Sequence, residues 1–214
     1  MTSGSARFGA VIRDVDACND DDPRRIKVDG VERPFEVVYS ERMSDRLSTM
    51  YPSASELLRI AARAQHIRRW DIPRNRYAEG RNGYNDWRNV CRNHHAGLIA
   101  SIMQRHGYDD TASGRVGMLV KKEQLKKDRD SQALENVVAV VFVEHYFDEF
   151  LDKHASYNED KLIDIIGKTL RKMSPKGHAV ALALRLPKRT KLLVEAALAR
   201  EADTLAKLAT FAID

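Results

Sequence analysis

Length, composition and charge predict a soluble globular protein and exclude several other classes. The chain has 214 residues, of which 43% are hydrophobic and 31% charged, and its formal net charge is +5. This length suits one domain with a sizeable core, and no apolar run approaches the roughly 20 residues of a membrane span. The N-terminus lacks the pattern of a secretory signal, and Cys18 and Cys91 match no metal or redox spacing. We therefore expect a cytoplasmic protein with no membrane partner.

Helical periodicity accounts for most of the first half of the chain. A helix is predicted over residues 5–18, followed by the cap and breaker residues of NDDDP, and a second from near Pro34 to just before Pro52. The next helix, residues 54–70 (ASELLRIAARAQHIRRW), is expected to begin with a capping box formed by Ser53 and Glu56. The start of residues 71–89 is predicted to be an irregular loop rich in arginine and aromatic residues. Helices are then predicted over 84–107 and 109–125.

The second half is also predicted to be helical. Residues 131–154 contain VVAVVFVEHYF and are apolar almost all round, so they predict a central, buried helix. Amphipathic helices are predicted over 158–174 and 187–214. The economical interpretation is one all-α domain spanning residues 1–214, with residues 1–33 as an N-terminal helix and loop packed on it.

The positive charge is concentrated in one segment. Residues 51–93 contain nine arginines, no lysine and four acidic residues, a surplus equal to that of the whole chain. Arginine is preferred over lysine where phosphate or carboxylate is bound by two parallel hydrogen bonds. The alternative is a basic surface that is simply solvated or faces nucleic acid. The modest inference is an anionic ligand.

The helix predicted over residues 54–70 carries an unusual polar face. Glu56, Arg59, Arg63, His66 and Trp70 recur at intervals of three or four residues, so they are expected to share one side of that helix. An ordinary solvated face would more often carry lysine and glutamate. This face is therefore predicted to line a site, with Glu56 kept as a helix cap.

Three polar residues on three predicted helices suggest a metal site. His66 ends the polar face, His95 lies in NHHAGL, and Glu144 follows seven apolar residues, where an unpaired carboxylate would be costly. Two histidines and one carboxylate form a recurrent open metal site for Mn, Fe, Co or Zn. The alternatives are that the histidines are hydrogen-bonded without a metal and that Glu144 pairs with Arg59 or Arg63.

Several blocks of the chain resemble an uncharacterised domain-of-unknown-function family. They are YSERMSDRLSTMYPSASELLRIAARAQHIRRWDIPR, GYNDWR, HHAG, VFVEHYFDEF and KLIDIIGKTLRKMSPKG, which together cover most of the chain. Some members are labelled glutamyl-tRNA synthetase without good cause. The chain has no phosphate-binding glycine motif, so ATP-dependent ligase chemistry is not expected. The resemblance implies no established activity.

A more distant similarity is to the HD-domain metal-dependent phosphohydrolases, and it implies an HD-domain-like helical bundle. Gln65 and His66 stand where that superfamily has a His-Asp pair, NHHAG falls near a further histidine, and Glu144 takes the place of a final aspartate. Tyr39 or Ser40 stands about where the first histidine would be. The similarity therefore implies His66, His95 and Glu144 as candidate metal ligands, with two ligands of the superfamily missing or changed.

These observations leave two classes of function open. The first is a metal-dependent hydrolase acting on a small anionic, phosphorylated substrate, with an iron-dependent oxygenase as a variant. The second is a non-catalytic module that binds RNA, a nucleotide or a protein through the arginine- and aromatic-rich face. The second places its ligand on the same arginine- and aromatic-rich face as the first. The substrate-binding residues predicted for the first are Arg59, Arg63, Arg69, Arg74, Trp70, Tyr84, Trp87 and Lys122.

Overall fold

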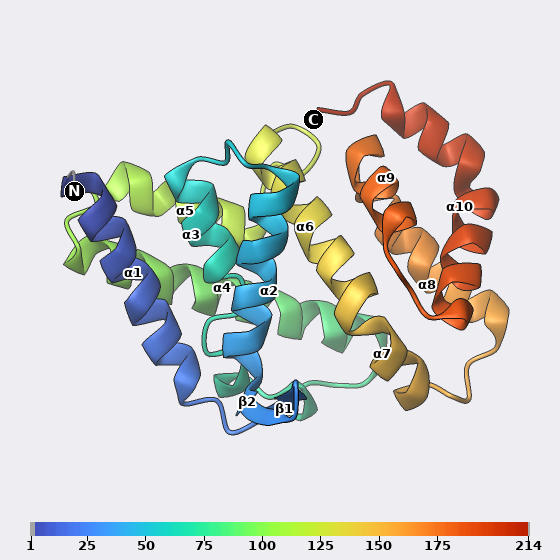
Figure 1. Cartoon of the computed structure of the whole chain (residues 1–214), viewed down its shortest axis with the longest axis horizontal. Helices are drawn as coiled ribbons and strands as arrows, with labels where there is room; N and C mark the ends of the chain where they lie inside the picture. The colour runs from blue at the N-terminus through green and yellow to red at the C-terminus, as the bar shows by residue number, and fades with distance from the viewer. Residues whose placement is uncertain (1–2, 214) are drawn as a thin grey trace. The chain divides into compact units, whose positions relative to one another are not determined.

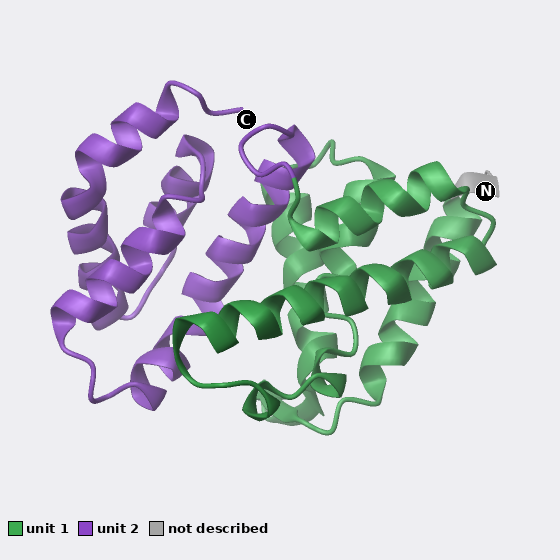
Figure 2. Cartoon of the chain, turned by 180° about the vertical axis from the view of Figure 1, so that it is seen from behind, with its two compact units in different colours: residues 1–123 green, residues 124–214 purple. Residues whose placement is uncertain are grey.

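The computed structural model describes residues 3–213 and confirms the predicted all-α class. Within these residues every element is a helix except for one sheet of two short strands (Figure 1). Residues 1, 2 and 214 lie outside the described part. They belong to the predicted domain of residues 1–214, and to the predicted N-terminal segment 1–33 and last helix 187–214. The chain divides into two compact units, residues 1–123 and 124–214 (Figure 2). The single domain predicted from the sequence stays a prediction.

The first unit packs five α-helices around an apolar core. Helix α3 contacts α1, α2 and α5, and α4 lies along α5. The core includes Met43 and Leu47 of α2, Ile60 of α3 and Met103 of α4, all of them 1% exposed or less. The helices are α1 (Ser3–Asp20), α2 (Phe35–Met50), α3 (Glu56–Arg63), α4 (Gly80–Arg105) and α5 (Asp110–Lys121).

A β-hairpin between α1 and α2 was not predicted from the sequence. Strands β1 (Arg25–Val28) and β2 (Val31–Pro34) pair antiparallel, with Val28 opposite Val31. Asp29 and Gly30 both have positive φ, as a two-residue hairpin turn requires, and Asp-Gly is a preferred pair there. The hairpin ends directly at α2 and so fixes the entry of that helix into the core.

Helix α3 is shorter than predicted. It ends at Arg63, and its N-cap is Ser55, whose side chain accepts a hydrogen bond from the Leu58 N–H. Ser53 is therefore not the cap, and Glu56 accepts a hydrogen bond from the Tyr108 hydroxyl instead (2.6 Å). The residues after Arg63 form turns and the short 3₁₀ helix η1 (Arg69–Asp71). The prediction of one continuous polar helix face from Glu56 to Trp70 is wrong for this reason.

The second unit contains five helices. The helix predicted over residues 131–154 is divided at Tyr146 into α6 and α7, and a separate helix, α9, precedes the last one. Within the unit, α8 packs against α10, and α6 against α9. The bounds are α6 (Arg129–His145), α7 (Phe147–Lys153), α8 (Glu159–Leu170), α9 (Pro175–Ala183) and α10 (Lys188–Ala209).

The described helices also bear on the membrane prediction. In the part of the chain that the structure covers, none has both the length and the apolar character needed to cross a bilayer.

Candidate functional site

The candidate site lies in the first unit, where buried polar side chains from α2, the turn after α3, and α4 come together. Glu36 stands in the first turn of α2 and is fully buried. Its Oε1 accepts a hydrogen bond from Arg24 Nη2 (2.6 Å), and Arg24 also binds the buried carboxylate of Asp22 (2.8 Å). Burial raises the pKa of Glu36, against the opposing effect of Arg24. Its Oε2 has no hydrogen-bond partner among the described residues.

His66 lies beside this unpartnered oxygen. The His66 ring stacks on Tyr39 of α2 with 4.1 Å between ring centroids, and its Nδ1 is 3.6 Å from Glu36 Oε2. The side chain is 22% exposed. Burial, followed by the positive charges of Arg69 and Lys122, holds the pKa of His66 well below its usual value. The imidazole is therefore neutral at pH 7 and available as a base or as an acceptor.

His95 contributes a second neutral imidazole. It is buried on α4, and its Nδ1 is 2.7 Å from the Ile67 carbonyl oxygen. A carbonyl oxygen only accepts hydrogen bonds, so Nδ1 carries the proton and Nε2 has a free lone pair. This Nε2 is buried without a hydrogen-bond partner in the described chain. Burial, with His66 and Arg69 nearby, lowers the pKa of His95 to about 3.

Two arginines near His66 have aromatic partners and no carboxylate partner within the described residues. The Arg69 guanidinium lies over the Trp87 ring, 4.5 Å from its centroid, and Arg88 lies over Tyr84 at 5.6 Å. Both arginines contribute to lowering the pKa of His66. An arginine stacked on an aromatic ring keeps its hydrogen-bond donors free. The site therefore combines neutral bases with positive charge that is not neutralised locally.

The turn that places His66 and Arg69 contains a left-handed residue. Arg68 has φ of +50°, which is uncommon for a residue with a side chain. Its N–H donates to Oδ1 of the buried Asn19 (3.0 Å), and its guanidinium donates to Asp71 (2.9 Å). Such strain persists only where surrounding contacts hold it, and it is frequent at functional sites. Asn19 and Asp71 thus hold the backbone that carries His66 and Arg69.

Cys91 lies on α4 between Arg88 and His95 but has no chemical role in this arrangement. It is 2% exposed and forms no disulfide. Burial raises the pKa of its thiol, so the reactive thiolate is disfavoured at neutral pH. Cys91 is a packing residue.

The predicted metal ligands are not all placed in one unit. His66 and His95 belong to the first unit, with ring centroids 6.0 Å apart, whereas Glu144 lies on α6 in the second. Glu144 was expected to be buried, but its side chain is 24% exposed and lies 3.3 Å from His145. Nowhere in the described chain are three or more His, Cys, Asp or Glu side chains grouped to hold a metal ion. The predicted metal and its ligand set stay a prediction.

The predicted substrate-binding residues fall into two groups. Arg69, Trp87 and Tyr84 lie at the His66 site, and Lys122, at the end of α5, is close enough to lower the pKa of His66.

The remaining predicted residues make other contacts. Arg74 binds the carbonyl oxygens of Tyr77 and Ala78, so it stabilises the loop, and Trp70 lies under the Arg68 guanidinium. Arg59 and Arg63 line a separate pocket.

Sequence reasoning missed several residues of this site. Glu36 is the buried carboxylate next to His66, and its place in the first turn of a helix, where acidic residues are common, gives no signal of that burial. Arg88 is one of the nine arginines of residues 51–93, and the sequence pattern does not distinguish it from the others. Asp22 and Arg24 depend on the unpredicted hairpin, and no local pattern indicates them.

Comparison with protein families places the chain in one of them. The family model described as "Domain of unknown function (DUF4202)" matches residues 9–194. The chain belongs to this family. This confirms the family resemblance seen in the sequence, while the similarity to HD-domain enzymes stays a prediction. No curated protein and no solved structure matches the chain.

Proposed function

We propose that the first unit is a hydrolase for a small phosphorylated anion, with the reaction centred on His66. The observation that carries this proposal is the pair Arg69 and Arg88, neither of which forms an ion pair with a carboxylate of the described chain, although Arg69 is near enough to Glu36 to oppose the rise in its pKa. Both contribute to the positive potential at a neutral, partly exposed imidazole. Guanidinium groups held in this way bind phosphate oxygens by charge-assisted hydrogen bonds.

The neutral imidazole of His66 supplies the acid–base chemistry. Its Nδ1 lies 3.6 Å from Glu36 Oε2, beyond hydrogen-bond distance, and we assign Nε2 as the nitrogen that accepts a proton. Water transfers its proton to Nε2 while its oxygen forms a bond to phosphorus. The ester P–O bond then breaks, and the leaving oxygen takes the proton from His66. Arg69 and Arg88 stabilise the charge that develops on the phosphoryl oxygens.

The free lone pairs near His66 suggest how water would be held. Glu36 Oε2 and His95 Nε2 are both buried acceptors without donors among the described residues. A buried acceptor left unpaired costs about 1–3 kcal/mol, so a water molecule or a substrate hydroxyl that donates to either one would relieve that cost. This mechanism uses the side chains of the chain itself.

A second candidate function rests on the aromatic side chains. The rings of Trp70, Trp87 and Tyr84 each carry a stacked arginine, and Tyr84 is 43% exposed. Arginine with aromatic rings is also typical of surfaces that bind RNA or nucleotides without catalysis. This function predicts that binding weakens steeply as the salt concentration rises and that no substrate is turned over.

Hydrolysis by the full chain distinguishes the two functions. The protein, dialysed against a chelator, is assayed with phosphomonoesters and phosphodiesters, both without metal and with added Mn, Fe, Co or Zn. We expect turnover that is lost in His66→Gln, falls at least tenfold in Arg69→Gln and persists in Arg81→Gln, which removes an exposed charge from the same helix as Arg88. Activity only with added metal would return the mechanism to the predicted metal-dependent class. A folded protein that turns over no phosphoester under any condition would contradict the proposal.

A further inference from the structure

A second concave feature of the first unit lies between α1, α2 and α3. It is a pocket of about 240 Å³, and each helix contributes a distinct kind of side chain to its wall. Phe8 and Ile12, one turn apart on α1, and Leu47 on α2 form the apolar part. Ser44 and Ser48 add two hydroxyl groups on the same face of α2.

The third wall is positively charged. Arg59 and Arg63 lie one turn apart on α3 and complete the lining. Arg63 is bound to Asp16 of α1 (2.6 Å), so its charge is neutralised. Arg59 donates a hydrogen bond to the Pro52 carbonyl oxygen (3.0 Å) and has no carboxylate partner within the described chain. The pocket therefore has an apolar body and one available positive charge at its rim.

This pocket is separate from the His66 site. Glu36 and Tyr39, which contact His66, lie in the first turns of α2, whereas Ser44, Leu47 and Ser48 lie in its later turns. The eight residues from Glu36 to Ser44 correspond to about 12 Å along a helix axis. None of the residues that line the pocket contacts His66 or His95 through a ring stack, ion pair or hydrogen bond in the described structure.

We propose that this pocket binds a small amphiphile with one anionic head group, a carboxylate or a phosphate, and an apolar body. The apolar body contacts Phe8, Ile12 and Leu47, and the head group takes the free guanidinium donors of Arg59 at the rim. The binding does not depend on the chemistry proposed at His66.

Matched probes of equal chain length test the proposal on the full-length protein. Octanoate, octyl phosphate, octanol and octylamine are titrated by calorimetry at low ionic strength. Octanoate and octyl phosphate are expected to bind at least tenfold more tightly than octanol, and octylamine not at all, because only an anion pairs with Arg59. A preference of octanoate over octyl phosphate, or the reverse, identifies the head group. Equal affinity for octanol and octanoate, or no binding of any probe, would overturn the proposal.

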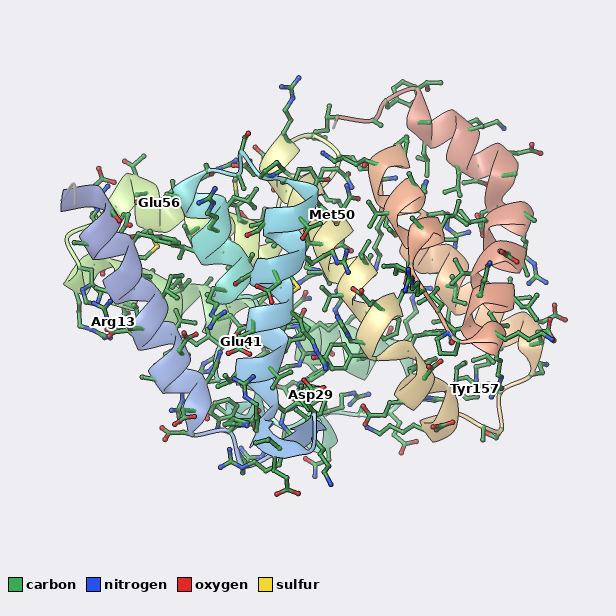
Figure 3. All side chains as sticks on the ribbon, viewed as in Figure 1. Arg13, Asp29, Glu41, Met50, Glu56 and Tyr157 are labelled. Atoms are coloured by element: carbon green, nitrogen blue, oxygen red, sulfur yellow. The ribbon has the colours of Figure 1, made fainter. Side chains whose placement is uncertain are left out.

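Variants then assign the binding to this pocket. Arg59→Gln is expected to weaken octanoate binding about tenfold, whereas Arg13→Gln, which removes an exposed charge from α1 outside the pocket, changes it less than twofold (Figure 3). Ile12→Trp fills the apolar part and is expected to abolish binding. Equal effects of Arg59→Gln and Arg13→Gln would show only general charge attraction and overturn the proposal. Inorganic phosphate binding at His66 is expected to be unchanged in Arg59→Gln, so failure of one site is distinguishable from failure of the other.

Discussion

Two clusters of buried polar side chains, one in each unit, differ in their hydrogen bonds. In the second unit, Gln132 Nε2 donates to Asn136 Oδ1, Asn136 Nδ2 donates to Ser174 Oγ, and the Ser174 N–H donates back to Asn136 Oδ1. In the first unit, Glu36 Oε2 and His95 Nε2 have no hydrogen-bond partner among the described residues beside His66. Buried polar groups that serve stability are normally satisfied, and each exception calls for an explanation, of which a functional site is one. We therefore expect the Asn136 network to stabilise the second unit, and the proposed function gives the His66 cluster a ligand to bind.

The largest expected effect on the free energy of unfolding follows from removing the side chain of Asn136, which is the centre of the hydrogen-bonded network in the second unit. Asn136→Ala removes the acceptor of the Ser174 N–H, the donor to Ser174 Oγ and one of the two acceptors of the Gln132 amide, whose other acceptor is the Lys172 carbonyl oxygen. This loss should lower the free energy of unfolding by about 3 kcal/mol. Urea denaturation measures this, with the exposed Asn85→Ala as the control. Phosphate binding per folded molecule should be unchanged. A loss below 1 kcal/mol would contradict the stabilising role of the network.

A glycine beside the same network should resist substitution. A Cβ on Gly177 of α9 would lie 2.8 Å from Asn136 Oδ1 and 3.1 Å from Met173 Cε. Because hydrogen bonds hold the Asn136 side chain in place, Gly177→Ala should cost about 2 kcal/mol despite the better helix propensity of alanine. Gly114→Ala in α5 meets nothing within 4 Å and should stabilise the protein by up to about 1 kcal/mol. If both variants were stabilised equally, the packing around Asn136 would be looser than described.

The His66 cluster, in which Glu36 Oε2 and His95 Nε2 lack hydrogen-bond partners among the described residues, should make the stability of the protein depend on pH. The pKa of His95 is about 3 in the folded protein and near 6.5 in the unfolded chain. Between these two pH values the unfolded chain binds a proton on His95 and the folded chain does not. Stability should therefore fall between pH 6.5 and 3, by about 1.4 kcal/mol per pH unit from His95 alone. Glu36 has the opposite effect on stability above pH 4.5, because its raised pKa lets the folded chain keep a proton that the unfolded chain releases. Glu36 is present in both the wild type and His95→Gln. Denaturation at pH 6.5 and 5 should show a smaller loss in His95→Gln than in the wild type, and equal losses would contradict a buried, neutral His95.

The smallest expected effect on stability concerns Arg69. Because Arg69 lies on Trp87 and forms no ion pair among the described residues, Arg69→Gln removes repulsion with nearby cations together with a longer-range attraction to Glu36, and the two changes oppose each other. Its free energy of unfolding should change by less than about 0.5 kcal/mol. Arg63→Gln breaks a partly buried pair with Asp16 and serves as the contrasting variant, with a larger loss expected. Strong destabilisation by Arg69→Gln would show that this residue is structural.

The sequence predicted the helices well because their signals are local. The helices around Tyr39, Ile99 and Val140 follow from apolar periodicity, proline and glycine. Periodicity could not show that α3 stops at Arg63, because the apolar spacing continues through Ala64 and Ile67, which are buried in the turns that follow. Tertiary contacts, including the one between Arg68 and Asn19, determine that break.

The candidate site was only partly predictable, for a related reason. His66, His95 and Arg69 were identified because their types and positions are unusual for a solvated helix face. The carboxylate was assigned to Glu144 because of the apolar run before it, whereas Glu36 lies beside His66. An acidic residue in the first turn of a helix usually complements the helix dipole at the surface, so Glu36 attracts no notice in the sequence. Its burial depends on Arg24, which is twelve residues away across the hairpin.

The binding of inorganic phosphate by the full chain tests the central claim most directly. Calorimetric titration at low ionic strength compares the wild type with the double variant Arg69→Gln, Arg88→Gln and with Arg81→Gln, which removes one exposed charge from α4. We expect the wild type and Arg81→Gln to bind phosphate with similar affinity and the double variant to bind at least tenfold more weakly. Equal affinity in all three proteins, or no binding to the folded wild type, would contradict the assignment of the His66 cluster as an anion site.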